Sequence, residues 1–118
     1  MALNRAMVIA LAALLLAQSS TEAANSRYTV EALMRDCSGE AFQKMACTSF
    51  VSGVLDGSLA TTANEARKPV ICLPEVYSNR SVREAALNWL RVHPQYNEMN
   101  AGSMVLIAMT KQFPCTTR

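Results

Sequence analysis

The sequence predicts a small all-α domain, a bundle of about four helices held together by two disulfide bonds. The chain has 118 residues, which is enough for at most one domain. Apolar residues recur with helical periodicity along most of it, and only four glycines and four prolines interrupt the pattern. Four cysteines are an even number, which in a small exported domain is typical of two disulfides.

The amino terminus has the three-part pattern of a cleaved signal peptide. Arg5 is followed by an unbroken apolar run from Ala6 to Ala17 and then by a polar cluster. Small residues at Thr21 and Ala23 suit a cut after residue 23, and a cut after Ser19 is the alternative. The sequence therefore predicts export of the chain.

A membrane anchor is the competing interpretation of the same segment, and its length argues against this. The apolar run has 12 residues, whereas a membrane-spanning helix needs about 20. No cysteine follows the run that could carry a lipid at a new amino terminus. We therefore expect residues 1–23 to be removed and residues 24–118 to form a helical domain outside the cytoplasm, with no stable membrane insertion.

Charge excludes one class of partner. The 11 Lys and Arg residues exceed the nine Asp and Glu residues by a net charge of only +2. Arg67-Lys68 is the longest cationic run in the chain. Because nucleic-acid binding by electrostatics needs a basic patch or stripe, we expect no nucleic-acid partner.

The first two helices are predicted from their apolar spacing. The first follows Thr29, a suitable N-cap, and stops at Gly39. Its apolar positions recur at i, i+3, i+4 and i+7: Val30, Leu33, Met34 and Cys37. The second extends from about Glu40 to Leu59. Its predicted buried stripe is Phe42, Met45, Ala46, Phe50 and Val54.

Small residues form a line along the second helix. Ser49, Gly53 and Gly57 lie four apart, which removes side chains along one side of the helix. That spacing is best known from membrane helices that approach each other closely. In this chain we expect it to serve helix packing in a water-exposed bundle.

The third and fourth helices carry clearer boundary signals. Ser81 followed by Glu84 predicts a capping box at the start of the third helix, and Pro94 stops it. Its predicted buried face is Val82, Ala85, Ala86, Trp89 and Leu90. The fourth helix is expected from about Tyr96 to Gln112, with one face made of Met99, Gly102, Leu106, Met109 and Phe113. Its run of apolar residues from 104 to 109 predicts a central helix.

Residues 60–80 differ from the rest of the chain. The stretch from Thr61 to Val70 is polar, has no periodicity and includes Pro69. Cys72-Leu73-Pro74 then fixes the chain before a second irregular stretch. A connection this long in so small a domain is either functional or disordered.

The helix order favours one of the three ways to pair four cysteines. Cys37 ends the first helix and Cys47 lies in the first turns of the second, so a helical hairpin brings them together. Cys72 precedes the third helix and Cys115 follows the fourth, which places both at the open end of a second hairpin. The sequence therefore predicts the pairs Cys37–Cys47 and Cys72–Cys115.

Catalytic chemistry is not indicated. The cysteines are assigned to disulfides, and His93 is the only histidine, placed before a proline at a helix end where it caps the helix or faces solvent. No two cysteines have the spacing of a zinc site. We expect no catalytic residue, no metal and no cofactor, and hence a binding protein.

The residues around the cysteines resemble a known family. The segment Cys47-Thr-Ser-Phe50-Val-Ser-Gly53-Val-Leu-Asp56-Gly57 is similar to the Cys-x-x-aromatic-x-x-Gly-x-x-Asp-Gly motif of the Rap/Tai family. Three further pieces fall in the family's order: Cys72-Leu73-Pro74, Trp89-Leu90-Arg91-Val92-His93-Pro94 and Phe113-Pro114-Cys115. Rap/Tai proteins are periplasmic immunity proteins that neutralise peptidoglycan amidases injected by the bacterial type VI secretion system.

The resemblance implies a function and a contact surface. Its members bind the amidase through a protruding loop that blocks the active-site cleft, often as a dimer. By position, the matching stretch here is 60–71, and its polar contact candidates are Asn64, Glu65, Arg67 and Lys68. The resemblance thus implies a periplasmic amidase inhibitor that binds a cognate effector and forms a homodimer. Alternatively, these four residues are an ordinary solvated loop.

Two other classes of function remain compatible with the sequence. One is a periplasmic acid-stress chaperone, which is also small, helical and disulfide-bonded and which opens when its carboxylates are protonated. The other is an exported scaffold or inhibitor unrelated to secretion systems. An amidase gene next to this one would favour the immunity function.

Overall fold

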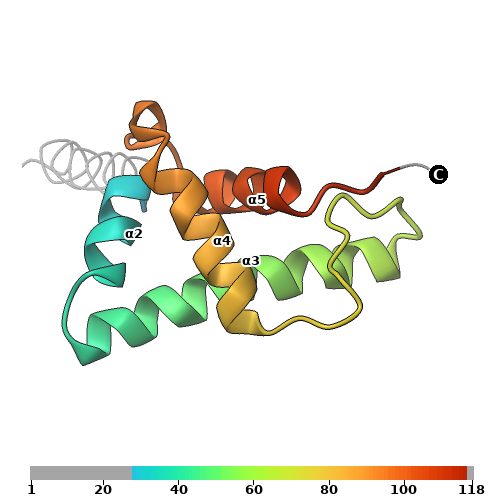
Figure 1. Ribbon diagram of the computed structural model, residues 1–118, viewed down its shortest axis with the longest axis horizontal. Helices are drawn as coiled ribbons and strands as arrows, with labels where there is room; N and C mark the ends of the chain where they lie inside the picture. Colours follow the sequence, from blue (N-terminus) through green and yellow to red (C-terminus); the bar gives the residue numbers. More distant parts are fainter. Residues whose placement is uncertain (1–27, 117–118) are drawn as a thin grey trace, which may run out of the picture.

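The computed structural model describes residues 28–116, so the predicted signal peptide at 1–23 lies outside the described residues. The described residues form four α-helices and one 3₁₀ turn (Figure 1): α2 (Val30–Cys37), α3 (Ala41–Asn64), α4 (Asn79–Arg91), η1 (Pro94–Tyr96) and α5 (Ala101–Gln112). The predicted all-α class and the number of helices are confirmed. No helix within 28–116 is long and apolar enough to cross a membrane.

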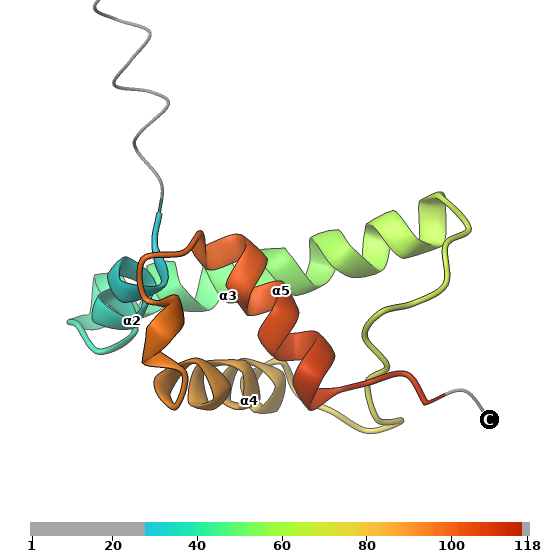
Figure 2. The ribbon, with the colours of Figure 1, turned by 90° about the horizontal axis from the view of Figure 1, so that it is seen from above.

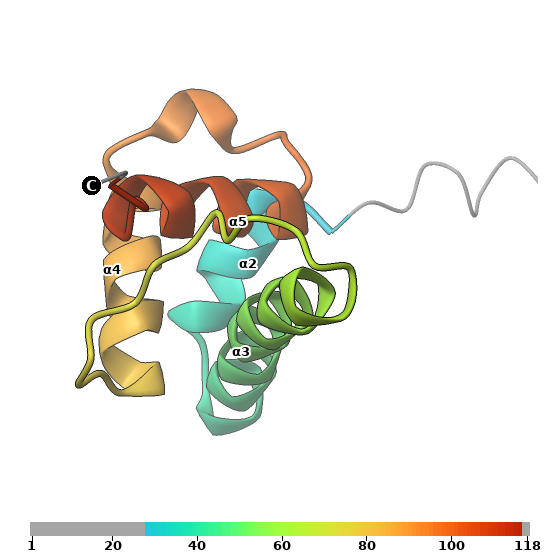
Figure 3. The same ribbon diagram turned by 90° about the vertical axis from the view of Figure 1, so that its right-hand side faces the viewer.

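Helix α5 occupies the centre of the bundle. It packs against α2, α3 and α4 (Figures 1 and 3). Five of its side chains belong to the core: Ala101, Met104, Val105, Ala108 and Met109. The apolar run in its sequence predicted this central position correctly, because a helix needs partners on several sides to bury apolar residues all round.

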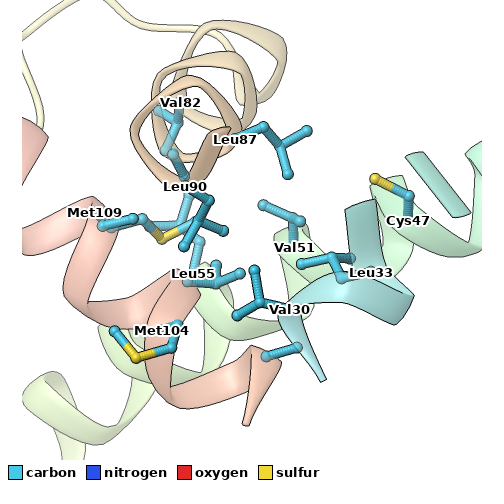
Figure 4. Packing of buried hydrophobic residues seen from close by; sticks show 14 of the residues in the cluster. Val30, Leu33, Cys47, Val51, Leu55, Val82, Leu87, Leu90, Met104 and Met109 are labelled. Atoms are coloured by element: carbon cyan, nitrogen blue, oxygen red, sulfur yellow. The ribbon is translucent and has the colours of Figure 1, made fainter. Parts of the chain in front are cut away.

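The core itself is aliphatic and draws on every α-helix. Val30 and Leu33 come from α2, Val51 and Leu55 from α3, and Leu90 from α4 (Figure 4). No buried polar or charged residue lies among them in the described part of the chain. Stability therefore rests on apolar burial and on the two disulfides, as expected for a domain of this size.

Helix α2 begins as predicted. The Thr29 side chain accepts a hydrogen bond from the Ala32 backbone N–H at 3.2 Å, which satisfies a donor at the open end of the helix. An isolated antiparallel bridge joins Thr29 to Asn100, the N-cap of α5. The starts of α2 and α5 are thus tied together, although they lie far apart in the sequence.

Helix α3 differs from its predicted form in both face and length. Its buried residues are Cys47, Val51 and Leu55, whereas Phe42 and Met45 of the predicted stripe are 76% and 59% exposed. Apolar residues occur all round α3, so periodicity could not define its inner face. The Cys37–Cys47 bond selects that face, because it turns Cys47 toward α2.

The helix also continues beyond Leu59 to Asn64. Thr61 and Thr62 donate their hydroxyl hydrogens to the carbonyls of Gly57 and Ser58, one turn earlier, at 2.8 and 3.0 Å. Apart from Thr62, residues 60–64 are exposed, and their polar sequence reflects a helix end that projects beyond the core. The expectation of an irregular stretch from residue 60 was therefore wrong for 60–64.

Helix α4 starts one turn earlier than expected. Ser78, not Ser81, is the N-cap, and its hydroxyl oxygen accepts from the Ser81 backbone N–H at 3.1 Å. The Ser81 hydroxyl takes the place of the expected Glu84 by accepting from the Ser78 N–H at 3.2 Å. The buried face is Val82, Ala86, Leu87 and Leu90. As predicted, α4 ends shortly before Pro94.

Helix α5 starts later than expected. Tyr96 belongs to the 3₁₀ turn η1, and Asn100 caps α5 by accepting from the Ser103 N–H at 3.0 Å. Met99 therefore precedes the helix and is 52% exposed, although it was predicted on the packed face. Met109, from the same predicted face, is fully buried.

Both predicted disulfides are present. Cys37 pairs with Cys47 at a Cα–Cα distance of 5.1 Å, and Cys72 pairs with Cys115 at 4.9 Å. They close loops with sequence separations of 10 and 43 residues. In the chain-entropy model these loops correspond to stabilisation of about 3 and about 4 kcal/mol. Helical-hairpin reasoning from the sequence was sufficient to find both pairs.

Candidate partner-binding surface

The predicted contact stretch divides into a helical and a non-helical part. Asn64 is the last residue of α3, and Glu65 is its C-cap. We call residues 65–71, which follow the helix, the basic loop. It lies at the end of α3 that projects away from the bundle (Figures 1 and 2). Every residue from 65 to 70 is exposed.

The basic loop turns sharply away from α3. The Glu65 N–H donates to the Thr61 carbonyl at 3.0 Å, and the Arg67 N–H donates to the Thr62 carbonyl at 3.3 Å. Ala66 between them has a φ of 49°, in the left-handed region that usually takes glycine at a helix end. The turn thereby satisfies two carbonyls of the last turn and sends the chain back toward the core.

The far end of the loop is fixed to the core. Ile71 is buried, and the Cys72 N–H donates to the Phe113 carbonyl at 2.9 Å. The bond between Cys72 and Cys115 ties the same point to the carboxyl-terminal segment. The basic loop is thus exposed along its length and restrained at both ends.

Charge on the loop is mostly positive. Arg67 forms an ion pair with Glu65, with Nε and Oε2 2.5 Å apart, and both side chains are largely exposed. Lys68 has no ion-pair partner among residues 28–116. A pair this exposed contributes at most about 1 kcal/mol to stability, so both cations are available to a partner.

An apolar groove adjoins the loop. It has a volume of about 410 Å³ and lies between the outer half of α3, the loop and α5. Its apolar walls include Val54, Val70 and Leu106, and its remaining lining residues are Gly53, Gly57, Ser58, Thr61, Thr62, Arg67 and Lys68. The loop cations therefore stand beside an open apolar surface.

The groove explains where the helical glycines lie. We expected Gly53 and Gly57 to allow close approach of a second backbone. That expectation is wrong for the described residues, because a Cβ added at either glycine would have no neighbour within 4 Å. The missing side chains instead leave space that forms part of the groove.

The four sequence-predicted contact residues are only partly brought together. Arg67 and Lys68 both line the groove, and Glu65 is connected to them through its ion pair. Asn64 is exposed at the helix end and does not line the groove. Sequence reasoning missed the contribution of Leu106, and only the spacing of Gly53 and Gly57 could have indicated an open surface.

The single histidine has a structural contact. His93 Nδ1 lies 2.6 Å from the Trp89 carbonyl oxygen at the end of α4. Its ring also stacks on the Trp89 ring, with a centroid distance of 3.9 Å. His93 therefore makes both contacts with Trp89, in the last turn of α4. This is the capping position that the sequence suggested. No group of three or more potential metal ligands occurs within the part of the chain that the structure describes.

Comparison with known proteins identifies a family for this chain. A family model described as Rap1a immunity proteins matches residues 29–115, which is nearly the whole described domain. No curated protein and no solved structure matches the chain.

Proposed function

Because the chain belongs to the Rap1a immunity protein family, whose members bind a cognate effector, we propose that its effector is a peptidoglycan amidase delivered by a type VI secretion system. The basic loop would enter the amidase cleft and exclude the substrate. The protein itself would catalyse no reaction. Support for the amidase comes from the sequence motifs around Cys47, Cys72 and Cys115.

The observation that carries this proposal is the combination of exposure and restraint in the basic loop. Arg67 and Lys68 are exposed, while Ile71 and the bond from Cys72 hold one end of the loop in place. A segment that is already ordered loses little entropy on binding. An inhibitor that plugs a cleft needs both properties.

The site of action would be the periplasm. Residues 1–23 have the pattern of a signal peptide. Two disulfides suit an oxidising compartment. Fractionation of cells that express the full chain tests this: the mature protein is expected in the periplasmic fraction, and full-length protein in the cytosol would contradict it.

A homodimer is part of the proposal. The outward side of α3 exposes Phe42 and Met45 near its start. Aromatic residues and methionine are enriched in the cores of interfaces between copies. Sedimentation equilibrium is expected to show a dimer that Phe42→Glu dissociates, with an unchanged helical circular dichroism spectrum.

The effector is tested by charge reversal on the loop. Arg67→Glu combined with Lys68→Glu is expected to weaken binding to the amidase encoded nearest the gene at least about 100-fold, or roughly 2.7 kcal/mol. The matched control reverses two exposed cations elsewhere, Arg35 on α2 and Arg80 on α4. It is expected to bind as the parent protein does.

Calorimetric titration measures both variants, and circular dichroism checks their folding. Equal affinity of the loop variant and the parent would place the interface elsewhere. Failure of the parent protein to bind any amidase would contradict the proposed effector. In that event, suppression of aggregation of an acid-denatured client would indicate the chaperone function instead.

A further inference from the structure

A second, smaller pocket lies on another part of the molecule, between the first half of α3 and α4. It has a volume of about 230 Å³. The disulfide between Cys37 and Cys47 lines it, together with Leu87 of α4. Figure 4 shows Cys47 and Leu87 at this side of the core. None of its lining residues belongs to the groove beside the basic loop.

Cations reach this pocket from both helices. Arg83 and Arg91 lie on one face of α4 with Leu87 between them at helical spacing, and Lys44 faces them from α3. Glu84 is the single acidic residue in the lining. The lining therefore carries three cationic side chains and one carboxylate.

Arg83 is the most covered of the three cations. Its side chain is only 18% exposed, and its sole ion pair within the described range is a 3.7 Å contact with Glu84, whose own side chain is 52% exposed. Covering part of a charged side chain is costly, so an anionic partner is favourable beside it. The unpartnered N–H groups of Arg83 are open to solvent, and hence to a ligand.

The other donors are also available. The Arg91 guanidinium donates one hydrogen bond, to the Asn88 side chain, and has further N–H groups. Thr48 is different, since its hydroxyl donates to the Lys44 carbonyl at 2.9 Å and so offers no proton to a ligand. The lining thus supplies two guanidinium groups and one ammonium group as donors.

We propose that this pocket binds a phosphate-class oxyanion, either free phosphate or the phosphate of a lipid headgroup. Two guanidinium groups suit a tetrahedral oxyanion because each can form paired hydrogen bonds to its oxygens. An ammonium group on the opposite helix contacts the remaining side. The anion would neutralise the cations that face one another and would hold α4 against α3.

Titration of the disulfide-bonded protein with inorganic phosphate tests the site. Amide chemical shifts of residues around the pocket are followed at constant ionic strength, with chloride as the compensating salt, since screening would otherwise mimic weak binding. The expected result is saturable binding. Arg83→Gln is expected to raise the Kd at least about tenfold, as loss of charge-assisted hydrogen bonds predicts.

Variants at two exposed pocket residues test the site without disturbing folding. Arg91→Gln and Lys44→Gln remove pocket cations from exposed positions and should weaken phosphate binding without loss of helical signal. Arg80→Gln is the matched control, because Arg80 lies on α4 outside the pocket. No saturable shift up to about 20 mM phosphate, well above a millimolar Kd, would overturn the site. An equal effect of Arg80→Gln would overturn it as well.

The source of the phosphate group is distinguished with vesicles. Flotation with phosphatidylglycerol vesicles, but not with phosphatidylcholine vesicles, together with loss of flotation in Arg83→Gln, would assign a lipid headgroup. Phosphate binding without flotation would assign a free oxyanion.

Discussion

The backbone N–H of Cys72 donates a hydrogen bond to the carbonyl of Phe113 over 2.9 Å, two residues before the cysteine to which Cys72 is bonded. This hydrogen bond and the disulfide therefore join the same two segments of the chain. The first segment is the end of the basic loop, and the second is the stretch that follows α5. This junction therefore restrains the far end of the basic loop.

Removal of the second disulfide should affect both stability and loop order. Cys72→Ala with Cys115→Ala is expected to lower the free energy of unfolding by about 4 kcal/mol, and Cys37→Ala with Cys47→Ala by about 3 kcal/mol. Chemical denaturation measures both values. Hydrogen exchange in the basic loop should accelerate only in the first variant. Equal acceleration in the two variants would contradict the role of the Cys72 junction.

Much of the fold was predictable because its signals are local. Thr29 caps α2 as expected, and the cysteines lie at the ends of hairpins whose topology follows from short connections. Both disulfides followed from helix order alone. The central position of α5 followed from an apolar run that has no polar side to expose.

The boundaries of α4 and α5 were missed for a shared reason. Their caps, Ser78 and Asn100, lie in segments where several polar residues could serve the same purpose. Ser81 and Glu84 matched the capping-box pattern, yet Ser78 and Ser81 form the box instead. A sequence alone does not rank competing caps, because the choice depends on how the helix packs.

The candidate site was harder to predict than the fold. Arg67 and Lys68 stood out as a basic pair, but the groove beside them needs Leu106 from α5 and Val70 from the loop. That contact is set by tertiary packing. The spacing of the glycines of α3 did indicate a feature of the surface. The expected feature, close packing of a second backbone, was wrong, because the space beside the glycines is open.

Open space beside Gly57 leads to a stability prediction. Gly57→Ala is expected to raise the free energy of unfolding by about 0.5–1 kcal/mol, because glycine in a helix costs that much and the added Cβ meets nothing. Gly39→Ala is the contrasting case. There the Cβ would collide with the Gln43 side chain, which accepts from the Glu40 N–H at 2.8 Å at the start of α3.

Thermal denaturation of the two variants should therefore shift in opposite directions. A loss of stability in Gly57→Ala would mean that another part of the protein occupies the groove in solution.

Ala66 provides a second stability test, at the start of the basic loop. With a φ of 49° it pays the steric cost of a left-handed residue, about 1–2 kcal/mol. Ala66→Gly removes that cost and is expected to stabilise the protein by up to about 1 kcal/mol once the added freedom of the unfolded chain is included. Ala63→Gly, three residues earlier inside α3, is the matched control and should cost about 1 kcal/mol. Urea denaturation measures the stability of both variants. A loss of stability in both would contradict the left-handed turn at Ala66.

Tyr28 makes the free energy of unfolding depend on pH in the alkaline range. Its ring packs edge-on against Phe50, with centroids 4.9 Å apart, and its hydroxyl donates a hydrogen bond to the Asp36 carboxylate. Burial, followed by this hydrogen bond and the charge of Asp36, raises the pKa of Tyr28 from 10.0 to about 12. The folded state therefore holds the phenolic proton more tightly than the unfolded chain does.

The sign of the effect follows from this difference in pKa. Below pH 10 Tyr28 is protonated in both states, and its contribution to stability is complete. As the pH rises from 10 to about 12, the unfolded chain loses the proton first, so stability falls across this range. Asp36→Asn removes the negative charge and should lower the pKa of Tyr28. Absorbance of tyrosinate at 295 nm measures the titration, with Tyr28→Phe to identify its signal. An unchanged titration of Tyr28 in the Asp36→Asn variant would show that Asp36 does not act on it.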